Sequence, residues 1–379
     1  MCSSDLLVAA EGLQRQALAI DIESRGDDSR EAAAVRESLA ITYADGDRYA
    51  EAAAMQQPVV AWRERHSGPD HPDTLVARYN QATYLLALGH ATQVAQIAED
   101  VVARQRRVLG ARHVELAGSL RLLARALDEA GRSEEARASI AEALAIHRES
   151  FGPSHLQVAL DLANQAAIDA RSGHVLPAAR EARAAVGILD AQSSRGAIVA
   201  TARTAAGAAL AEIGQLEDAD TQLSQALTVF RAQRREGIWF GRALDALGDV
   251  ARRRGQSARA AELGPQALGI LERSGGPEHP ASVLARVHAG AALWADGRGD
   301  EGERLLRSGL EALASAFPAG HPDLATARFL LGDALARTGR APEARPLLAA
   351  ALEWRQRQYG AADARTTEVR RLLAALEGR

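Results

Sequence analysis

Small and apolar residues recur along this chain with a period of about 42 residues. A turn-forming residue marks each period, and successive turn residues lie 41 or 42 positions apart. The turn residues are Asp47, Gly89, Gly131, Gly173, Gly214, Gly255, Gly297 and Gly339. The pattern therefore predicts eight repeats of one structural unit.

Three further positions of the repeat hold only Gly, Ala or Val. They lie seven residues before, five residues after and twelve residues after the turn residue. In the seventh repeat they are Gly290, Gly302 and Gly309. Small side chains at fixed points allow two helices to approach closely, where a Leu would hold the backbones apart. We therefore expect each repeat to be an antiparallel helix pair, and the repeats to stack into one solenoid.

The two ends of the chain predict incomplete units. Residues 13–20 repeat the second-helix pattern, since Ala17 precedes Val59 by 42 positions. We expect residues 7–28 to be the second helix of a truncated repeat, residues 29–362 the eight-repeat solenoid and residues 363–379 a C-terminal capping helix. Residues 1–6 match the translation of a sequencing adapter, so we expect them to be non-native and the natural protein to continue upstream.

Composition supports an all-α protein and restrains its function. The 379 residues are 47% hydrophobic and only 4% aromatic, as expected of a helical array built from small and unbranched side chains. A net charge of −4 gives no reason to expect binding to nucleic acid. All 45 basic residues are Arg, a codon preference that suggests a bacterial source.

Histidines at the repeat boundaries invite a chemical interpretation that their spacing does not support. His71, His113 and His155 are 42 residues apart, as are His279 and His321, so each occupies the same place in its own repeat. We expect them to begin helices, often with Pro at the first helical position, and we expect no metal site. The sequence also lacks motifs of nucleophilic, phosphate-binding or metal-dependent catalysis. We therefore expect no enzyme and no cofactor.

The offsets of the small residues resemble those of the tetratricopeptide repeat. The repeat length of 42 and segments such as 68–73, Gly-Pro-Asp-His-Pro-Asp, resemble the kinesin-light-chain subtype found in many bacterial proteins. The resemblance implies a right-handed superhelix whose first helices line a concave face. The entries to repeats five and six, at 193–196 and 234–237, lack the His-Pro signature. We expect these two repeats to be locally irregular.

The resemblance also implies which positions face a ligand. They lie thirteen, ten, nine, six, three and two residues before the turn, on the first helix. The resulting peptide-binding candidates are Tyr79, Asn80, Thr83, Arg121, Arg125, Asp128, Asn164, Arg171, Arg242, Asp245, Asp249, Arg252 and Trp294. Asn80 and Asn164 stand where peptide-binding relatives often place an Asn, whose amide can both donate to and accept from a ligand backbone. For any single polar residue, solvation of the helix is an equally good explanation.

Trp62 and Trp354 stand in a position otherwise filled by Ile or Val, which favours a role in the core. Trp239 and Phe240 lie at the entry to repeat six. They either plug an irregular connection or form an exposed contact, and the sequence leaves both open.

Two functions agree with this pattern. The first is a non-catalytic scaffold that binds a protein or peptide on the concave face of the superhelix. The second is the sensor or docking region of a larger bacterial regulator, such as a serine/threonine kinase or a transcriptional activator, whose effector domain lies upstream. We expect a cytoplasmic protein. The sequence leaves the partner, the oligomeric state and any contact with a membrane open.

Overall fold

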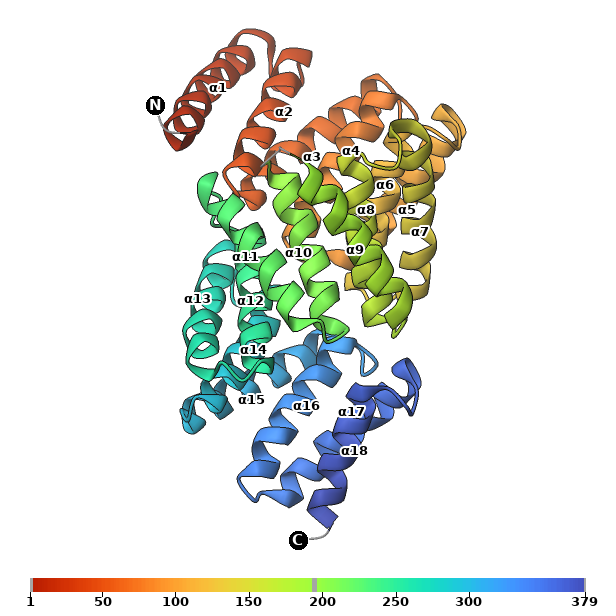
Figure 1. Cartoon of the computed structure of the whole chain (residues 1–379). Helices are drawn as coiled ribbons and strands as arrows, with labels where there is room; N and C mark the ends of the chain where they lie inside the picture. Colours follow the sequence, from red (N-terminus) through yellow and green to blue (C-terminus); the bar gives the residue numbers. More distant parts are fainter. Residues whose placement is uncertain (1–2, 193–195, 378–379) are drawn as a thin grey trace. The chain divides into compact units, whose positions relative to one another are not determined.

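Helices joined by short loops make up the described part of the chain, residues 3–192 and 196–377 of the computed structural model (Figure 1). The helices that open the repeats, with the C-terminal helix last, are α2 (Arg30–Asp45), α4 (Pro72–Ala87), α6 (Val114–Glu129), α8 (Leu156–Arg171), α10 (Ala197–Glu212), α12 (Ile238–Arg253), α14 (Pro280–Ala295), α16 (Pro322–Arg337) and α18 (Ala364–Glu377). The others are α1 (Ser3–Arg25), α3 (Tyr49–His66), α5 (Ala91–Leu109), α7 (Ser133–Phe151), α9 (Val175–Ala191), α11 (Leu216–Ala232), α13 (Ser257–Gly275), α15 (Gly299–Ala316) and α17 (Ala341–Tyr359).

Helices that follow one another in sequence pack together. Helix α2 contacts α3, α6 contacts α7, α12 contacts α13 and α14 contacts α15, and successive repeats are joined in the same way, as α3 to α4, α5 to α6, α13 to α14 and α15 to α16. First helices of successive repeats also pack on each other, as α12 on α14 and α14 on α16. The predicted all-α solenoid of helix pairs is confirmed.

The turn between the two helices of a repeat explains its glycine. The turn residues Gly89, Gly131, Gly173, Gly214, Gly255, Gly297 and Gly339 all have positive φ, between 74° and 90°. A side chain is strained in this left-handed region, and glycine is not. Repeat one uses Asp47 instead, at φ 58°, which is tolerable because Asp adopts this conformation more readily than most residues.

The small-residue positions are all buried where helices meet. Ala40, Ala52 and Val59 of repeat one are fully buried, and the equivalent residues of the other repeats are also buried. The approach is closest in repeat seven. A Cβ atom added to Gly290 would lie 2.8 Å from the carbonyl oxygen of Gly302, and one added to Gly302 would lie 2.6 Å from that of Gly290. These two backbones touch, so the positions admit only glycine.

The repeat-boundary histidines are N-caps of first helices. The Nδ1 atom of His113 accepts a hydrogen bond from the backbone N–H of Glu115 at 3.3 Å. His71, His155, His279 and His321 accept the equivalent bond at 3.1–3.3 Å. Each ring therefore satisfies a helical N–H that has no partner within the helix. The prediction that these residues begin helices is confirmed.

Repeats five and six keep the helix-pair pattern but connect differently. Helices α9 and α11 have 17 residues, whereas the second helices of the other complete repeats have 18 or 19. Of the loop entering repeat five, residues 193–195 lie outside the described residues, and Gly196 is the N-cap of α10. In the loop entering repeat six, Arg234 has a φ of 55°. Among the described residues of these two repeats, the left-handed Arg234 and the shorter helices are the departures from the other repeats.

Packing divides the chain into two compact units. Unit one holds the residues up to Asp161 together with Phe230–Gly237, and unit two holds Leu162–Val229 and the residues from Ile238 onward. The expected borders at residues 7, 29 and 363, the non-native segment 1–6 and the hand of the superhelix stay predictions. Residues 1–2 and 378–379 lie outside the described residues. Within the described part, no helix combines the length and the hydrophobicity that crossing a membrane requires.

The glycine contact predicts unequal effects of adding one methyl group. Gly290→Ala forces its Cβ against backbone atoms of α15 and should destabilise the protein by roughly 1–3 kcal/mol. Gly248, at the same position of repeat six, would place its Cβ no closer than 3.5 Å to its neighbours. Gly248→Ala should therefore be neutral or stabilise by up to about 1 kcal/mol through helix propensity. Chemical denaturation followed by circular dichroism measures both, and equal losses would contradict the assigned contact.

The histidine caps predict a second pair of substitutions. His113→Ala removes the acceptor and should cost about 1 kcal/mol of stability, whereas His113→Ser keeps a capping oxygen and should cost much less. His113 is suited to the test because its cap hydrogen bond lies at an exposed site. Thermal unfolding of the two variants beside the wild type makes the comparison. A serine variant as unstable as the alanine variant would show that the ring does not act as a cap.

Candidate functional site

The candidate residues of unit one lie on α4 and α6 and are mostly half-buried. Tyr79, Asn80 and Thr83 share α4, and the Thr83 hydroxyl donates to the carbonyl of Tyr79 at 2.9 Å. On α6, Arg125 is half-buried and Asp128 is buried at 7% exposure. The expected face therefore exists on these two helices, although much of its polar surface contacts the protein itself.

Arg121 of α6 is held inside unit one. Its Nη1 atom donates to Gln157 at 2.7 Å and to the fully buried carboxylate of Asp161 at 2.9 Å. The other oxygen of Asp161 lies 2.5 Å from Nδ1 of His147. Arg121 thus links repeats three and four, and this buried carboxylate depends on it. Its first role is structural, which the sequence interpretation did not anticipate.

The candidates of unit two form a denser cluster on α12. Asp245 lies 2.9 Å from Nδ1 of His288 on the next first helix, and Asp249 pairs with Arg252 at 2.7 Å. Burial opposes a charge on His288, but the carboxylates of Asp245 and Asp249 outweigh it and raise the pKa of His288 to about 9. Burial also opposes the charge of Asp249, yet Arg252 and His288 hold the pKa of that carboxyl below its ordinary range. His288 and Asp249 are therefore both charged at neutral pH.

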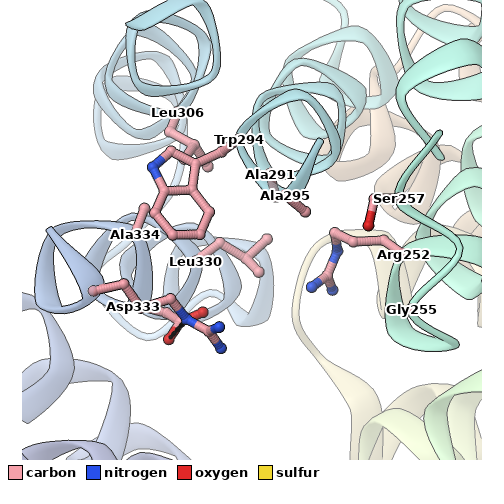
Figure 2. A pocket seen from close by; sticks show the side chains of 11 residues that line it. Arg252, Gly255, Ser257, Ala291, Trp294, Ala295, Leu306, Leu330, Asp333 and Ala334 are labelled. Atoms are coloured by element: carbon pink, nitrogen blue, oxygen red, sulfur yellow. Dashed lines mark hydrogen bonds and ion pairs between the residues drawn. The ribbon is translucent and has the colours of Figure 1, made fainter. Parts of the chain in front are cut away.

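A pocket of about 280 Å³ opens beside this cluster, where α12, α14 and α16 meet. In Figure 2 the indole of Trp294 lies beside Leu330 and Ala334, and Arg252 lies on the opposite side with Ser257. The lining also includes Gly255, Ala291, Ala295, Leu306, Asp333 and Arg337. We call this space the Trp294 pocket. Two of the predicted residues, Arg252 and Trp294, meet here.

The Trp294 pocket combines an aromatic surface with cationic groups. The guanidinium carbon of Arg337 lies 6.0 Å from the centre of the Trp294 ring, a cation–π distance. Arg337 pairs with Asp333 at 2.9 Å, and this hydrogen bond raises the pKa of Arg337. One bond to Asp333 occupies one of the five guanidinium N–H groups. The remaining donors can meet an anionic or carbonyl group of a ligand.

The sequence interpretation missed several residues of this site that its own positional rule contains. His288 and Leu330 lie nine residues before their turns, Asp333 lies six before and Arg337 two before. Applying the same positions to repeats seven and eight would have identified all four. Ser257 follows its turn and carried no such signal.

The remaining candidates lie apart from the Trp294 pocket. Arg242 stacks over Trp239, with its guanidinium carbon 5.4 Å from the ring centre. Phe240 is buried at 3% exposure, and Trp239 is half-buried. The sequence left two roles open, a plug of the repeat entry and an exposed contact. The burial of Phe240 fits the plug. Asn164 and Arg171 lie half-buried on α8 in unit two, so a groove that joins Asn164 to Asn80 and Arg121 stays a prediction.

Trp62 and Trp354 are only half-buried, whereas the sequence favoured a place in the core for both. The Trp62 indole N–H donates to the carbonyl of Asp28 at 2.9 Å, and that of Trp354 donates to the carbonyl of Gly320 at 2.7 Å. Both rings therefore fasten a second helix to the loop that precedes its own repeat.

Buried acidic side chains on α8 and α9 form another titratable site. Glu181 is 6% exposed, and its Oε2 atom has no hydrogen-bond partner in the protein. Burial first, and then the neighbouring carboxyl of Asp169, raise the pKa of Glu181 to about 7. Across residues 3–192 and 196–377, no group of three His, Cys, Asp or Glu side chains is placed to hold a metal ion.

Family profiles match three segments of the array. One tetratricopeptide-repeat profile matches residues 32–73 and 116–157, and another matches residues 284–353. Each of the first two segments is 42 residues long, the period found in the sequence. The chain is a tetratricopeptide-repeat protein. No curated protein sequence matches it significantly.

Two solved structures with TM-scores above 0.5 share the fold of this tetratricopeptide-repeat protein. A Rap protein complexed with competence and sporulation factor is 14% identical and has a TM-score of 0.58, with 92% of this chain and 98% of that chain covered. The Cut9–Hcn1 hetero-tetramer of the APC/C is 15% identical and has a TM-score of 0.57, with 96% of this chain and 58% of that chain covered. TPR-like repeats of a Podosopora anserina kinesin light chain are 22% identical at a TM-score of 0.43, covering 53% of this chain and 95% of that one.

The two raised pKa values predict two separate steps in stability with pH. The stabilisation from His288 is complete below pH 6.5 and is lost as the pH rises through about 9, because only the charged ring favours the folded state. The stabilisation from protonated Glu181 is complete below pH 4.5 and is lost as the pH rises through about 7. Each step should amount to at most about 3 kcal/mol.

Two neutral substitutions separate these steps. His288→Gln should remove the loss of stability between pH 6.5 and about 9 and keep the loss between pH 4.5 and about 7. Glu181→Gln should remove the loss at the lower pH and keep the loss at the higher pH. Thermal unfolding midpoints between pH 4 and pH 10 give the profiles. An alkaline step that survives in His288→Gln would assign that step to another group.

Proposed function

We propose that this tetratricopeptide-repeat protein is a non-catalytic scaffold that binds an extended segment of a partner protein on its first-helix face. By first-helix face we mean the positions two to thirteen residues before each turn that the candidate residues occupy. The Trp294 pocket is the anchoring point in unit two. It should take an apolar side chain of the partner that stands next to a carboxylate.

The size of the pocket supports a side chain as its occupant. Pockets that bury a whole small molecule measure roughly 300–1,000 Å³. At about 280 Å³, the Trp294 pocket lies just below this range and suits one or two side chains of a peptide.

The lining supports an apolar group beside an anionic one. Trp and Arg are the residues that most often dominate the energy of a protein interface. Trp294, Leu330 and Ala334 offer an apolar surface, and Arg252 and Arg337 also line the pocket. Each arginine already has a carboxylate partner, so the face as a whole is mixed in charge. Specific placement of donors, and not a strong positive field, should select the partner.

If the chain is the sensor or docking region of a larger bacterial regulator, its partner should bind the same first-helix face. A cytoplasmic location also stays a prediction.

Peptide display followed by titration calorimetry tests the proposal. Segments selected on the wild-type protein should bind Trp294→Ala at least about tenfold more weakly, because the indole supplies most of the apolar contact. Arg337→Ala should weaken binding less, and should reduce its dependence on salt.

The matched control is Arg304→Ala on α15, a second helix, where the exposed guanidinium donates to the carbonyl of Asp300. Binding to this variant should equal binding to the wild type. A segment whose affinity survives Trp294→Ala and falls with Arg304→Ala would place the ligand on the second helices and refute the proposal.

A further inference from the structure

Unit two closes on itself through a contact between residues far apart in sequence. Nη1 of Arg365, at the start of α18, donates to the carbonyl of Ala170 in the last turn of α8 at 3.1 Å, across 195 residues. The last carbonyls of a helix lack partners within the helix, and they carry the negative end of its dipole. A guanidinium is a suitable partner for such a carbonyl.

The surroundings of Arg365 are polar and closely fitted. Its guanidinium carbon lies 3.4 Å from the centre of the Tyr359 ring, and its nitrogens lie 3.1 Å from Asp363 and 3.5 Å from Glu212. Across the contact, a Cβ atom added to Gly173 would lie 3.1 Å from Cδ1 of Tyr359. Tyr359 therefore packs directly against the turn of repeat four. We call Ala170, Gly173, Tyr359, Asp363 and Arg365 the clasp.

Gly173 differs in this respect from the other turn glycines of unit two. Its φ is 84°, like the others, but Gly214, Gly255, Gly297 and Gly339 would each place a Cβ with no atom within 4 Å. The close approach at Gly173 therefore belongs to the clasp and not to the turn itself.

Unit one contains a second example of the same contact. Nη2 of Arg235 donates to the carbonyl of Ala44 at 3.3 Å, across 191 residues. Ala44 precedes its turn residue Asp47 by three positions, as Ala170 precedes Gly173. Arg235 also lies 3.2 Å from Asp47. Two arginines thus bind the equivalent carbonyl in repeats one and four. The recurrence favours a specific contact of the array over a chance one.

The clasp turns a row of helices into a ring. Within unit two, α9 packs on α10, and the first helices then pack in order, α10 on α12, α12 on α14, α14 on α16 and α16 on α18. The clasp joins the beginning of α18 to the end of α8. Because successive first helices contact one another directly, we place the first-helix face, with the Trp294 pocket on it, on the inner side of this ring.

We propose that the clasp is a releasable closure that controls access to the inner side of unit two. Its character supports this role, since charged and hydrogen-bonded groups form it, whereas buried Ala, Gly and Leu hold each helix pair together. The pair that Arg365 forms with Glu212 of α10 is long, at 3.5 Å, and Glu212 is partly exposed. Ion pairs of this kind are weak and sensitive to salt. A ligand that binds the open ring more tightly than the closed one would shift the equilibrium toward opening. The proposal concerns the ring itself and holds whatever ligand the first-helix face binds.

A distance measurement across the clasp tests its opening. Spin labels at Leu176→Cys and Ala362→Cys, both exposed positions on either side of the clasp, are attached in a Cys2→Ser background of the full chain. Double electron–electron resonance should give one narrow distance for the wild type. Arg365→Ala should give a longer and broader distribution, and Arg371→Ala, an exposed position of α18, should leave the distance unchanged.

A glycine pair provides an independent control. Gly173→Asn and Gly214→Asn place the same residue at φ 84° and 83°, so local backbone strain is matched, and Asn tolerates this region. Only Gly173→Asn adds side-chain atoms against Tyr359. It should lengthen the distance, and Gly214→Asn should not.

Access to the pocket gives the second readout. A cysteine introduced at Ala295, an exposed residue of the pocket lining, should react with a polymer-linked maleimide several-fold faster in Arg365→Ala than in the wild type, with no comparable gain for a small maleimide. The proposal is overturned if Arg365→Ala and Gly173→Asn keep the wild-type distance. It is equally overturned if they open the ring without changing the rate for the large reagent, or if Gly214→Asn opens it as much.

Discussion

The close approach of two helices within each repeat is the constraint on which this structure depends. Where Gly290 faces Gly302, the backbones of α14 and α15 come so near that a single Cβ would meet a carbonyl oxygen. In the other repeats Ala, Val or Gly fills the same places and is buried. This spacing fixes the position of every first helix relative to its partner. It therefore also fixes where the other side chains of the first helix can meet.

The Trp294 pocket follows from that geometry. Trp294 lies on the same helix as Gly290, one turn further on, and its backbone nitrogen lies where a Cβ on Gly302 would collide with it. The helix contact and the pocket therefore share Trp294, whose backbone packs on Gly302 and whose side chain lines the pocket. The side chains of Asp245, Asp249, Arg252 and His288 contact one another and add a polar boundary that joins neighbouring first helices. A site built in this way is stiff within a repeat, while adjustment between repeats depends on weaker polar contacts such as the clasp.

The repetitive features could be predicted from the sequence because a period is visible without coordinates. The turn position at Gly214, the buried position at Ala136 and the helix-opening position at His113 each recur at a fixed offset. The same offsets led to Arg252 and Trp294, and a complete use of them would have led to Arg337. Repetition therefore predicts where a side chain stands on its helix.

The sequence could not predict which partner each side chain takes in space. Arg121 has the same position in its repeat as Asp245. Arg121 forms an ion pair with the buried carboxylate of Asp161, whereas Asp245 contacts His288. The contact of Arg365 with Ala170 joins residues separated by about half the chain, and no periodic signal marks it. Trp62 and Trp354 occupy a core-like position but use their N–H groups to bind loop carbonyls, which hydrophobicity alone does not reveal. Long-range and polar contacts of this kind require the folded structure.

Hydrogen–deuterium exchange of the wild-type protein with a display-selected peptide tests the central claim most directly, because it maps the ligand without any substitution. If the first-helix face binds the partner, protection should concentrate in α12, α14 and α16, around Arg252, Trp294 and Arg337. Protection confined to α13, α15 and α17 would show that the ligand uses the second helices, and would contradict the account.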